Sequence, residues 1–379
     1  MELSEIREKI NAVDDQLLDL FLQRMDLSEE VAAYKNEHHQ PILNKQRERE
    51  ILAKVAEKSG DRERFSYHLF STIFELSRSR QAELITAPTK VESLVKASLA
   101  AGSEVFPQTG LVACQGVEGA YSQIACDRLF KRPAVLYLSS FDAVFSAIES
   151  GLCRYGVVPL ENSTAGSVNA VYDLMMNHNF RIVRSVRIKV DHCLLVNPGT
   201  KREEIREIYS HQQAISQCEK YLQSFPNARV IPCENTAVAA KMVAQAGRRD
   251  AAALSSHACG KIYGLSCLES SVQDMDNNFT RFICISKKLE IYPGADRTSL
   301  MAVLPHEPGS LYKLLSRFYA LGLNLNKLES RPLPNRNFEF MFYFDLETSV
   351  YSPQFLQLMG EMPTLCEEFS YLGSYSEVI

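Results

Sequence analysis

Residues 6–34 read IREKINAVDDQLLDLFLQRMDLSEEVAAY, and their apolar positions keep a strict 4-3-4-3 spacing. That spacing is typical of a long helix whose apolar seam packs against partner helices. Arg24 occupies one of the seam positions, where an unpaired guanidinium costs on the order of several kcal/mol. A side chain that snorkels to the edge of a helix bundle is one explanation for it. The other is that Arg24 faces a carboxylate or an anionic ligand.

Two further cations bear on that choice. Lys35 follows Arg24 by about three turns, so it returns to nearly the same face roughly 16 Å further along the axis. Together the two side chains would enclose a ligand about the size of a small dicarboxylate. Arg7 lies near the same seam but about 25 Å from Arg24, so it can reach that ligand only from a second, oppositely directed copy of the helix. This segment therefore predicts a dimer with a shared anion site.

The composition limits the possible functions. With 379 residues the chain is long enough for two or three domains, and its net charge of −5 argues against a nucleic-acid partner. Its 10 cysteines show no C-x-x-C pair and no metal-ligand spacing, which predicts reduced thiols in the cytoplasm and no metal. No apolar run approaches the length of a membrane span, and neither G-x-G-x-x-G nor a Walker A motif occurs. We therefore expect neither a membrane partner nor a cofactor.

The pattern along the chain predicts a multidomain protein. Residues 1–88 are expected to form an all-α helical domain and residues 89–108 a linker. Short apolar runs alternate with helical stretches over residues 109–288, which predicts α/β architecture with a largely parallel sheet and favours two lobes with a cleft between them. Residues 296–379 follow a β-α-β-β-α-β order, the α+β ferredoxin-like plan.

A set of polar residues in the helical module resembles that of the all-helical chorismate mutase family. The set comprises Arg7, Arg24, Lys35, Arg47, Glu48, Ser77 and Gln81. The resemblance implies that the three arginines clamp the carboxylates of chorismate, one of them from the other subunit. It implies that Lys35 and Gln81 contact the ether oxygen as catalytic groups, and that Glu48 and Ser77 hold the hydroxyl end. A pericyclic rearrangement fits such a set, because it needs fixed positive charge but no acid, base or nucleophile. Asn44, a candidate helix N-cap, stands where one member of that family has aspartate.

Three segments of the middle module place glycine or polar residues at strand ends. They are QGVEGAYS (115–122), VPLENSTAG (158–166) and NFTRF (278–282). A glycine loop before a helix is a general anion cradle, although it can equally be a tight turn. Polar residues after an apolar strand mark the edge where α/β proteins bind ligands. These segments resemble prephenate dehydratase, whose most specific signature is Thr-Arg-Phe, and residues 210–218 and 234–240 extend the match.

That resemblance implies two α/β lobes like those of a periplasmic binding protein, with prephenate in the cleft. We expect the Thr280 hydroxyl to contact the leaving oxygen as the catalytic group. The expected prephenate-binding residues are Asn162, Ser163, Thr164, Arg281 and Phe282. Because neighbouring side chains of a strand point to opposite faces, at most one of Thr280 and Arg281 need face the cleft directly. His211 is a candidate acid, although a single histidine at a strand end is more often structural. Ala120 stands where the family often has a hydroxyl residue, and we give its side chain no role.

The last module has two segments of interest. Residues 307–311 (EPGSL) open a predicted helix and residues 328–332 (LESRP) close a predicted strand. A Pro-Gly helix start is also ordinary turn chemistry. Together, in a ferredoxin-like unit, the segments resemble the ACT regulatory domain of dehydratases that are inhibited by phenylalanine. The resemblance implies an L-phenylalanine site at a subunit interface, formed by Gly309, Ser310, Leu311, Glu329 and Ser330.

These resemblances cover nearly the whole chain and imply one bifunctional enzyme family. Its members convert chorismate to prephenate and prephenate to phenylpyruvate without cofactor or metal. The resemblance further implies feedback inhibition by L-phenylalanine and a homodimer formed through the first helix, with a tetramer left open. A fusion of the mutase with prephenate dehydrogenase is a rival, but the chain lacks a dinucleotide loop. Two more rivals are a two-lobe binding protein that acts as a regulator and an enzyme in which one catalytic module has decayed.

Overall fold

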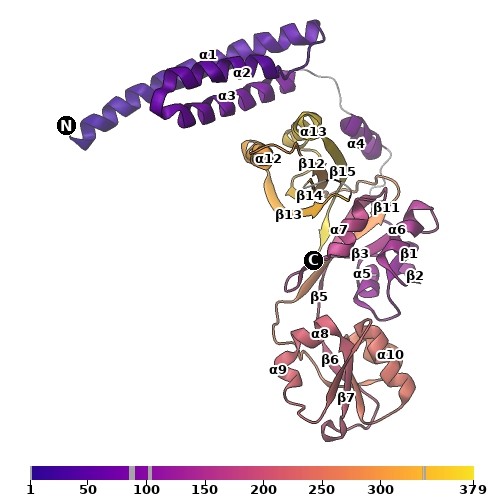
Figure 1. Ribbon diagram of the computed structural model, residues 1–379. Helices are drawn as coiled ribbons and strands as arrows, with labels where there is room; N and C mark the ends of the chain where they lie inside the picture. The colour runs from indigo at the N-terminus through magenta and orange to yellow at the C-terminus, as the bar shows by residue number, and fades with distance from the viewer. Residues whose placement is uncertain (1, 85–89, 101–104, 335, 337–338) are drawn as a thin grey trace. The chain divides into compact units, whose positions relative to one another are not determined.

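The computed structural model describes residues 2–84, 90–100, 105–334, 336 and 339–379. The chain forms two compact units (Figure 1). One comprises Met1–Ser93 with Pro353–Leu365, and the other comprises Leu94–Ser352 with Cys366–Ile379. Among the described residues no helix combines the length and the apolar character that a membrane crossing requires.

Three helices carry the polar residues of the first unit. They are α1 (Leu3–Glu37), α2 (Lys45–Ser59) and α3 (Glu63–Leu84), with a 3-10 turn η1 (Gly60–Arg62) between the last two. Helix α3 packs against both α1 and α2 (Figure 1). Asn44 caps α2, because its side-chain oxygen accepts a hydrogen bond from the Arg47 N–H at 3.0 Å. The apolar seam of α1 is exposed over much of its length in the single chain, at Ile6, Ile10, Val13, Leu17, Leu20, Leu27 and Val31.

The second unit begins at Leu94, within helix α4 (Lys90–Ala100), and this helix lies inside the segment expected to be a linker. A seven-stranded sheet follows, in the order β16-β5-β11-β3-β1-β2 with β4 paired to β3. We call this sheet and its helices the first lobe. Its strands are β1 (Thr109–Gln115), β2 (Arg132–Leu138), β3 (Tyr155–Asn162), β4 (Gly166–Ser167), β5 (Arg181–Lys189), β11 (Phe279–Ser286) and β16 (Glu377–Val378). Its helices are α5 (Tyr121–Leu129), α6 (Phe141–Glu149) and α7 (Asn169–Met175).

The two faces of this sheet carry different cores. On one face, buried residues such as Ile283 and Val158 pack with α6 and α7. On the other face, Phe282 and Val157 pack with α5. Alternate residues of one strand therefore point into different surroundings, as the two-residue period of a β-strand requires.

A second lobe is inserted between β5 and β11. It holds a five-stranded sheet in the order β10-β6-β9-β7-β8. Its strands are β6 (Cys193–Val196), β7 (Glu207–His211), β8 (Arg229–Cys233), β9 (Ala251–Ser255) and β10 (Ser266–Glu269). Beside them lie a 3-10 turn η2 (Arg202–Glu204) and the helices α8 (Gln212–Gln217), α9 (Glu219–Leu222), α10 (Thr236–Ala246) and α11 (His257–Tyr263) (Figure 1). Every residue of β9 is buried, as expected of a short strand that is apolar except for its last residue, Ser255.

The expectation of a largely parallel sheet is wrong, because both sheets are mixed. In the first lobe β1 is parallel to β2 and β3, but β11 is antiparallel to both β3 and β5. The chain leaves the first lobe after β5 and re-enters it at β11, so β11 fills the gap between β5 and β3 in the opposite direction. That reversal depends on the inserted second lobe, which no local sequence pattern encodes.

The C-terminal part follows the β-α-β-β-α-β chain order. Its elements are β12 (Arg297–Val303), α12 (Ser310–Ala320), β13 (Asn324–Pro332), β14 (Phe340–Glu347), α13 (Pro353–Leu365) and β15 (Glu368–Tyr375). The four strands form an antiparallel sheet in the order β13-β14-β12-β15, which we call the C-terminal sheet. Tyr343 and Tyr375 of this sheet share a buried core with Tyr172 of α7. The chain then ends in β16, which pairs in parallel with β5 of the first lobe (Figure 1).

Candidate active sites

A cationic cluster lies between α1 and α3 in the helical unit. Arg24 donates a hydrogen bond to the Ser77 hydroxyl, and Lys35 donates one to Gln81 Oε1 at 3.1 Å. Ser77 and Gln81 are both buried, as their spacing on one face of α3 allows. The backbone carbonyl of Ile42 also accepts a hydrogen bond from Lys35. The structure thus brings together four of the predicted chorismate-site residues.

The charges of this cluster are only partly compensated. Burial lowers the pKa of Arg24, and the nearby Glu48 carboxylate opposes that effect. Burial also lowers the pKa of Lys35, which Glu48 raises and Arg78 lowers further. Glu48 therefore lies within electrostatic reach of both cations, as a fifth predicted member of the cluster. An anionic ligand would relieve the cost of burying these two positive charges.

Arg78 also belongs to this cationic cluster, although it was not among the residues predicted from the sequence. Its guanidinium forms an ion pair with Glu48, which joins α3 to α2. It precedes Gln81 by three residues, so helical spacing alone places it on a face next to that side chain.

Arg7 and Arg47 lie outside the cluster within the single chain. Arg7 is exposed, and the rise of α1 separates it from Arg24 by about 25 Å. The Arg47 side chain is 62% exposed and lies 3.4 Å from Glu50 Oε2 on its own helix.

In the second unit, Asn162 is the centre of a polar network at the end of β3. It pairs with Thr280 across the β3–β11 ladder, and its Nδ2 donates to Thr280 Oγ1 at 2.9 Å and to Asn278 Oδ1 at 2.8 Å. Its Oδ1 accepts hydrogen bonds from the Thr164 hydroxyl at 2.7 Å and from the Ala165 N–H at 2.9 Å. Asn162 thus uses both ends of its buried amide to fix Thr280 on one side and the turn after β3 on the other.

The network continues into the second lobe through Gln217 of α8. Gln217 Nε2 donates to Thr164 Oγ1 at 3.0 Å, and its Oε1 accepts from Asn278 Nδ2 at 2.9 Å. The same Oε1 lies 3.2 Å from Nε2 of His192, which is buried. Burial lowers the pKa of His192, so its ring is held neutral in this network. We call Asn162, Thr164, His192, Gln217, Asn278 and Thr280 the Asn162 network.

His192 and Gln217 were not among the predicted site residues. Gln217 belongs to the 210–218 segment that extends the dehydratase resemblance, so that segment was its available signal. His192 lies in the short connection between β5 and β6, at a crossing between the lobes, and a single histidine there has no distinguishing pattern.

Ser163 and His211 have local structural partners. Ser163 Oγ donates to the Asn277 carbonyl and accepts from the Phe279 N–H, both at 2.9 Å, so it fastens the chain that enters β11. His211 caps α8, with Nδ1 accepting from the Gln213 N–H at 3.3 Å. The geometry therefore supports a structural role for His211, as the cap of α8, over a role as an acid.

The glycine loop connects the two lobes. The Gly119 carbonyl accepts hydrogen bonds from Ser256 Oγ at 3.2 Å and Cys259 Sγ at 3.3 Å, both in the second lobe. Gly119 has φ +89°, and a Cβ there would lie 2.7 Å from Cys259 Sγ. Its N–H already donates to Gln123 Oε1 at 2.6 Å. The loop therefore acts in this structure as a close contact between lobes, and Ala120 behind it is buried.

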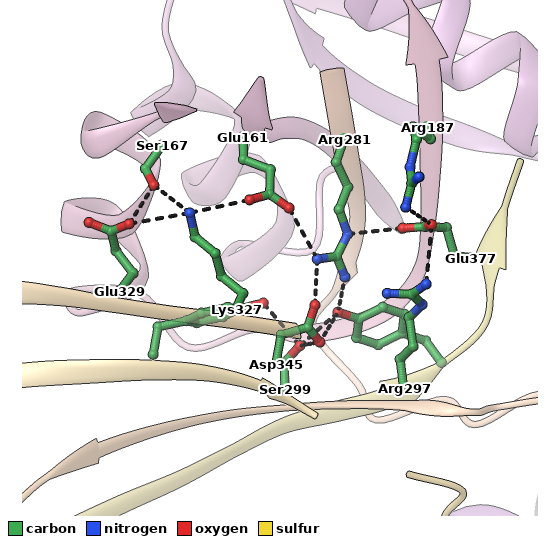
Figure 2. Close-up of polar contacts among 12 residues, drawn as sticks. Glu161, Ser167, Arg187, Arg281, Arg297, Ser299, Lys327, Glu329, Asp345 and Glu377 are labelled. Atoms are coloured by element: carbon green, nitrogen blue, oxygen red, sulfur yellow. Dashed lines mark hydrogen bonds and ion pairs between the residues drawn. The ribbon is translucent and has the colours of Figure 1, made fainter. Parts of the chain in front are cut away.

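Arg281 and Phe282 are not brought together with Thr280. The Arg281 side chain leaves β11 on the opposite face, where it pairs with Asp345 and Glu377 (Figure 2). The Phe282 side chain is buried in the core beneath α5.

The predicted phenylalanine-site residues lie on two elements. Gly309, with φ +86°, is the N-cap of α12, which begins with Ser310 and Leu311. Glu329 and Ser330 lie on the edge strand β13. Glu329 accepts a hydrogen bond from Ser167 of β4.

One group among the described residues could hold a metal ion. The ligand atoms of Cys193, His257 and Cys267 lie within 4.8 Å of one another in the second lobe. Burial, with a smaller effect of Cys267, raises the pKa of Cys193 to about 12, so the free thiol is protonated. None of the three residues belongs to the Asn162 network.

Comparison with known proteins gives matches over both units. The model of chorismate mutase type II matches residues 6–82, and the model of prephenate dehydratase matches residues 112–290. The bifunctional chorismate mutase/prephenate dehydratase of Escherichia coli (strain K12) is 31% identical over 381 residues, which cover 98% of this chain and 96% of that protein.

Two solved structures resemble the second unit. GqqA, described as a novel type of quorum quenching acylase, has a TM-score of 0.65 and 29% identity over 70% of this chain and 97% of that one. The prephenate dehydratase of Arthrobacter aurescens in complex with L-Phe has a TM-score of 0.64 and 25% identity over 71% of this chain and 90% of that one.

Proposed function

The chain belongs to the family of bifunctional chorismate mutase/prephenate dehydratases, and from this premise we propose which residues carry the two reactions and how the second is controlled. It has both enzyme activities, within aromatic amino acid biosynthesis. We assign residues 1–88 to the mutase, 109–288 to the dehydratase and 296–379 to a regulatory domain, with 89–108 as the linker.

In the mutase site, Arg24 binds a carboxylate of chorismate while Lys35 and Gln81 contact its ether oxygen. The rearrangement breaks that C–O bond as a new C–C bond forms, and negative charge grows on the oxygen in the transition state. Lys35 is fixed toward that position by Gln81, so its charge needs no reorganisation during the reaction. Ser77 orients Arg24, and Glu48 and Ser77 serve the hydroxyl end.

Arg7 completes the mutase site from a second chain. It cannot reach Arg24 from its own helix, and the seam of α1 that would cover a partner helix is exposed in the single chain. We therefore propose a homodimer through α1, with association to a tetramer left open. Arg47, whose side chain is 62% exposed and lies beside Glu50, is the proposed contact for the second carboxylate.

In the dehydratase site, Thr280 donates a hydrogen bond to the leaving hydroxyl of prephenate. Asn162 Nδ2 donates to Thr280 Oγ1, and among the described residues the Thr280 hydroxyl has no acceptor of its own. Because Thr280 Oγ1 accepts a hydrogen bond from Asn162, the hydroxyl hydrogen of Thr280 points away from Asn162. As the C–C bond to the carboxylate breaks, CO₂ is released and the electrons of that bond form the aromatic ring. The hydroxyl departs with its bonding pair and leaves as water after taking a proton from solvent. The donated hydrogen bond stabilises the charge that develops on this oxygen.

The Asn162 network also favours loss of the carboxylate. Its members are amides, hydroxyls and a histidine held neutral, and Arg281 points to the other face of the sheet. These groups offer no positive charge to stabilise the carboxylate of prephenate. The CO₂ product is neutral and needs no such charge, so this surrounding favours the product over the reactant. Asn162, Ser163 and Thr164 position the ring and side chain of prephenate.

The C-terminal domain is proposed to bind L-phenylalanine and to inhibit the dehydratase. Support comes from its β-α-β-β-α-β order and from the similarity of this chain to a prephenate dehydratase that was solved with L-Phe. Gly309, Ser310, Leu311, Glu329 and Ser330 are the proposed contacts. By linkage, bound phenylalanine weakens prephenate binding and bound prephenate weakens phenylalanine binding by the same factor.

Asn162 donating to Thr280 is the observation that carries the dehydratase assignment, and product analysis tests the whole sequence of reactions. Proton NMR of the purified protein with chorismate is expected to show prephenate first and phenylpyruvate later. Added L-phenylalanine should slow only the second step. Prephenate that accumulates and decays only at its spontaneous rate would refute the dehydratase assignment.

A further inference from the structure

Adjacent residues of strand β11 face two different environments. Across the β3–β11 ladder, Thr280 pairs with Asn162 and Arg281 pairs with Glu161. Because side chains alternate along a strand, the first pair points into the Asn162 network and the second points to the opposite face. Figure 2 shows Arg281 and Glu161 approaching Asp345 and Lys327 of the C-terminal sheet.

The buried partners of Arg281 all come from the C-terminal end of the chain. Its Nη1 forms an ion pair with Asp345 of β14, and its Nη2 donates to the Tyr375 hydroxyl of β15 at 3.0 Å. Its Nε lies 3.1 Å from Glu377 Oε1 of β16, an ion-pair contact without hydrogen-bond alignment. The side chains of Arg281, Asp345 and Glu377 are 6%, 0% and 3% exposed. We call Arg281, Asp345, Tyr375 and Glu377 the Arg281 cluster.

The Arg281 cluster is closed by further partners. Glu377 Oε2 lies 2.6 Å from Arg187 of β5 and 3.3 Å from Arg297 of β12. Asp345 Oδ1 accepts a hydrogen bond from Ser299 at 3.1 Å. Burial acts to lower the pKa of Arg281, but Tyr375 and Asp345 raise it by more, so the guanidinium stays charged. The buried guanidinium of Arg281 has one favourable position among these fixed partners. If it were displaced, either the guanidinium or the carboxylates would be left buried without a partner.

The ladder has an irregularity at the same place. Glu161 pairs with Arg281 but the next pair is Pro159 with Phe282, so Leu160 is the extra residue of a bulge in β3. A bulge changes the direction of the side chains around it and makes the local register depend on its surroundings. Arg281 is anchored beside this bulge by buried groups of β14, β15 and β16, and Glu161 of β3 is a further partner at 3.4 Å.

We propose that Arg281 is a positioning residue through which the C-terminal domain controls the dehydratase site. Asp345 and Glu377 hold its guanidinium, the guanidinium fixes β11 beside the bulge, and β11 presents Thr280 to Asn162. A movement of β14 or β16 displaces Arg281 and, through one peptide unit, Thr280. This inference rests on the proposed roles of Thr280 and of phenylalanine, and adds the contact by which the two are coupled.

Asp345→Asn tests the coupling, because it removes one charge from the cluster without changing its shape. A displacement of about 1 Å at a reacting group can lower a rate about 100-fold. We expect the dehydratase kcat to fall at least about tenfold, with KM changed by less than about twofold and the mutase rate unchanged. The inhibition by saturating L-phenylalanine should also become incomplete.

Asp173→Asn is the matched control. Asp173 of α7 accepts two hydrogen bonds from Arg331 of β13, at 2.7 and 2.9 Å, so this pair also ties the C-terminal sheet to the first lobe. Among the described residues no hydrogen bond or ion pair joins Asp173 or Arg331 to β11 or to the Arg281 cluster. We expect its dehydratase kcat and its inhibition to stay within about twofold of the unchanged protein. Equal losses in both variants would mean that the interface is merely loosened, and would overturn the proposal.

A second variant keeps the test decisive if Asp345→Asn fails to fold. Glu377→Gln changes the first residue of β16 and is expected to give the same split between kcat and KM, and Arg281→Lys should retain more activity than Arg281→Gln. If Asp345→Asn does not fold, wild-type kcat and inhibition in Glu377→Gln alone would overturn the coupling; if both variants fold, wild-type values in both would overturn it. If Thr280→Ala also turned over prephenate normally, the proposed function itself would fail; if Thr280→Ala were inactive, only the coupling would be lost.

Discussion

Thr280 and Arg281 are neighbours in β11 and point to opposite faces of one sheet. Thr280 Oγ1 accepts a hydrogen bond from Asn162 at 2.9 Å, whereas Arg281 pairs with Asp345 of the C-terminal sheet. In the proposed account, the Thr-Arg-Phe segment combines Thr280 as the group for the chemistry with Arg281 as the group that positions it. The two roles can be separated by mutation, because their partners are different.

Asn162→Ala is expected to lower the dehydratase kcat about 100-fold and leave the mutase rate unchanged. The change removes the donor that orients Thr280 and the acceptor for the turn after β3. It should also cost about 1–3 kcal/mol of unfolding free energy, since partners of the amide are left unsatisfied. Steady-state kinetics and urea unfolding measure both effects.

Asn177→Ala serves as the control for this change, because Asn177 is exposed and, within the described part of the chain, its side chain donates to the Asp173 carbonyl alone, at 3.0 Å. Its stability should change by about 0.5 kcal/mol or less. An Asn162→Ala enzyme with normal kcat would show that the orientation of Thr280 is unimportant.

Lys35→Ala is expected to reduce mutase turnover about 1000-fold without affecting prephenate turnover. Lys35 donates a hydrogen bond to Gln81, and in the proposed mechanism its positive charge stabilises the developing oxyanion. Chorismate consumption at saturating substrate measures the effect. Lys58→Ala, an exposed lysine in the last turn of α2, should leave that rate unchanged, and equal rates for both variants would remove Lys35 from the site.

Mixing two inactive variants tests the shared mutase site. Arg7→Ala and Lys35→Ala each inactivate a different part of the site. A mixed dimer of the two variants has one intact site, with Lys35 from one chain and Arg7 from the other. After unfolding and refolding together in equal amounts, about one quarter of the wild-type mutase activity should return. Absence of recovery, with mixed dimers shown by mass spectrometry, would contradict a contribution of Arg7 from the partner.

Stability is expected to fall as the pH drops below about 6.5, in part because of His192. Burial lowers its pKa in the folded protein, so the unfolded chain takes up a proton in this range while the folded one does not. The slope is at most about 1.4 kcal/mol per pH unit for one such group. Thermal unfolding at pH 7.5 and pH 5.0 should show a smaller loss for His192→Gln than for the unchanged protein.

The exposed His306 supplies the comparison for that experiment, and His306→Gln should keep the full pH dependence. If His192→Gln and the unchanged protein lost the same stability between the two pH values, the buried ring would not be the group that titrates.

Local patterns predicted much of what is local in this structure. Helical spacing predicted that Arg24 and Lys35 lie on one face of α1, and that Ser77 and Gln81 lie on one face of α3. The family resemblance, and not this spacing, implied that the two pairs form one site, where each cation contacts one of the α3 residues. Strand alternation predicted that Thr280 and Arg281 face opposite ways. Both expectations need only the repeat of one element.

The features that depend on distant segments were not predictable in this way. Arg281 finds Asp345 and Glu377 far along the chain, and β16 is too short to leave a pattern. Gln217 joins the Asn162 network only because the second lobe folds back on the first. The antiparallel placement of β11 has the same origin, since the direction of that strand is set by the inserted lobe.

The most direct measurement compares prephenate turnover by Thr280→Ala and Thr280→Ser, with the mutase rate of each protein as an internal control. Loss of the hydroxyl in Thr280→Ala should lower the dehydratase kcat by about 100-fold or more, and Thr280→Ser, which keeps a donor at the same atom, should retain most of it. The mutase rates should match that of the unchanged protein. A Thr280→Ala enzyme that forms phenylpyruvate at the normal rate would contradict the assignment of Thr280 to the leaving hydroxyl.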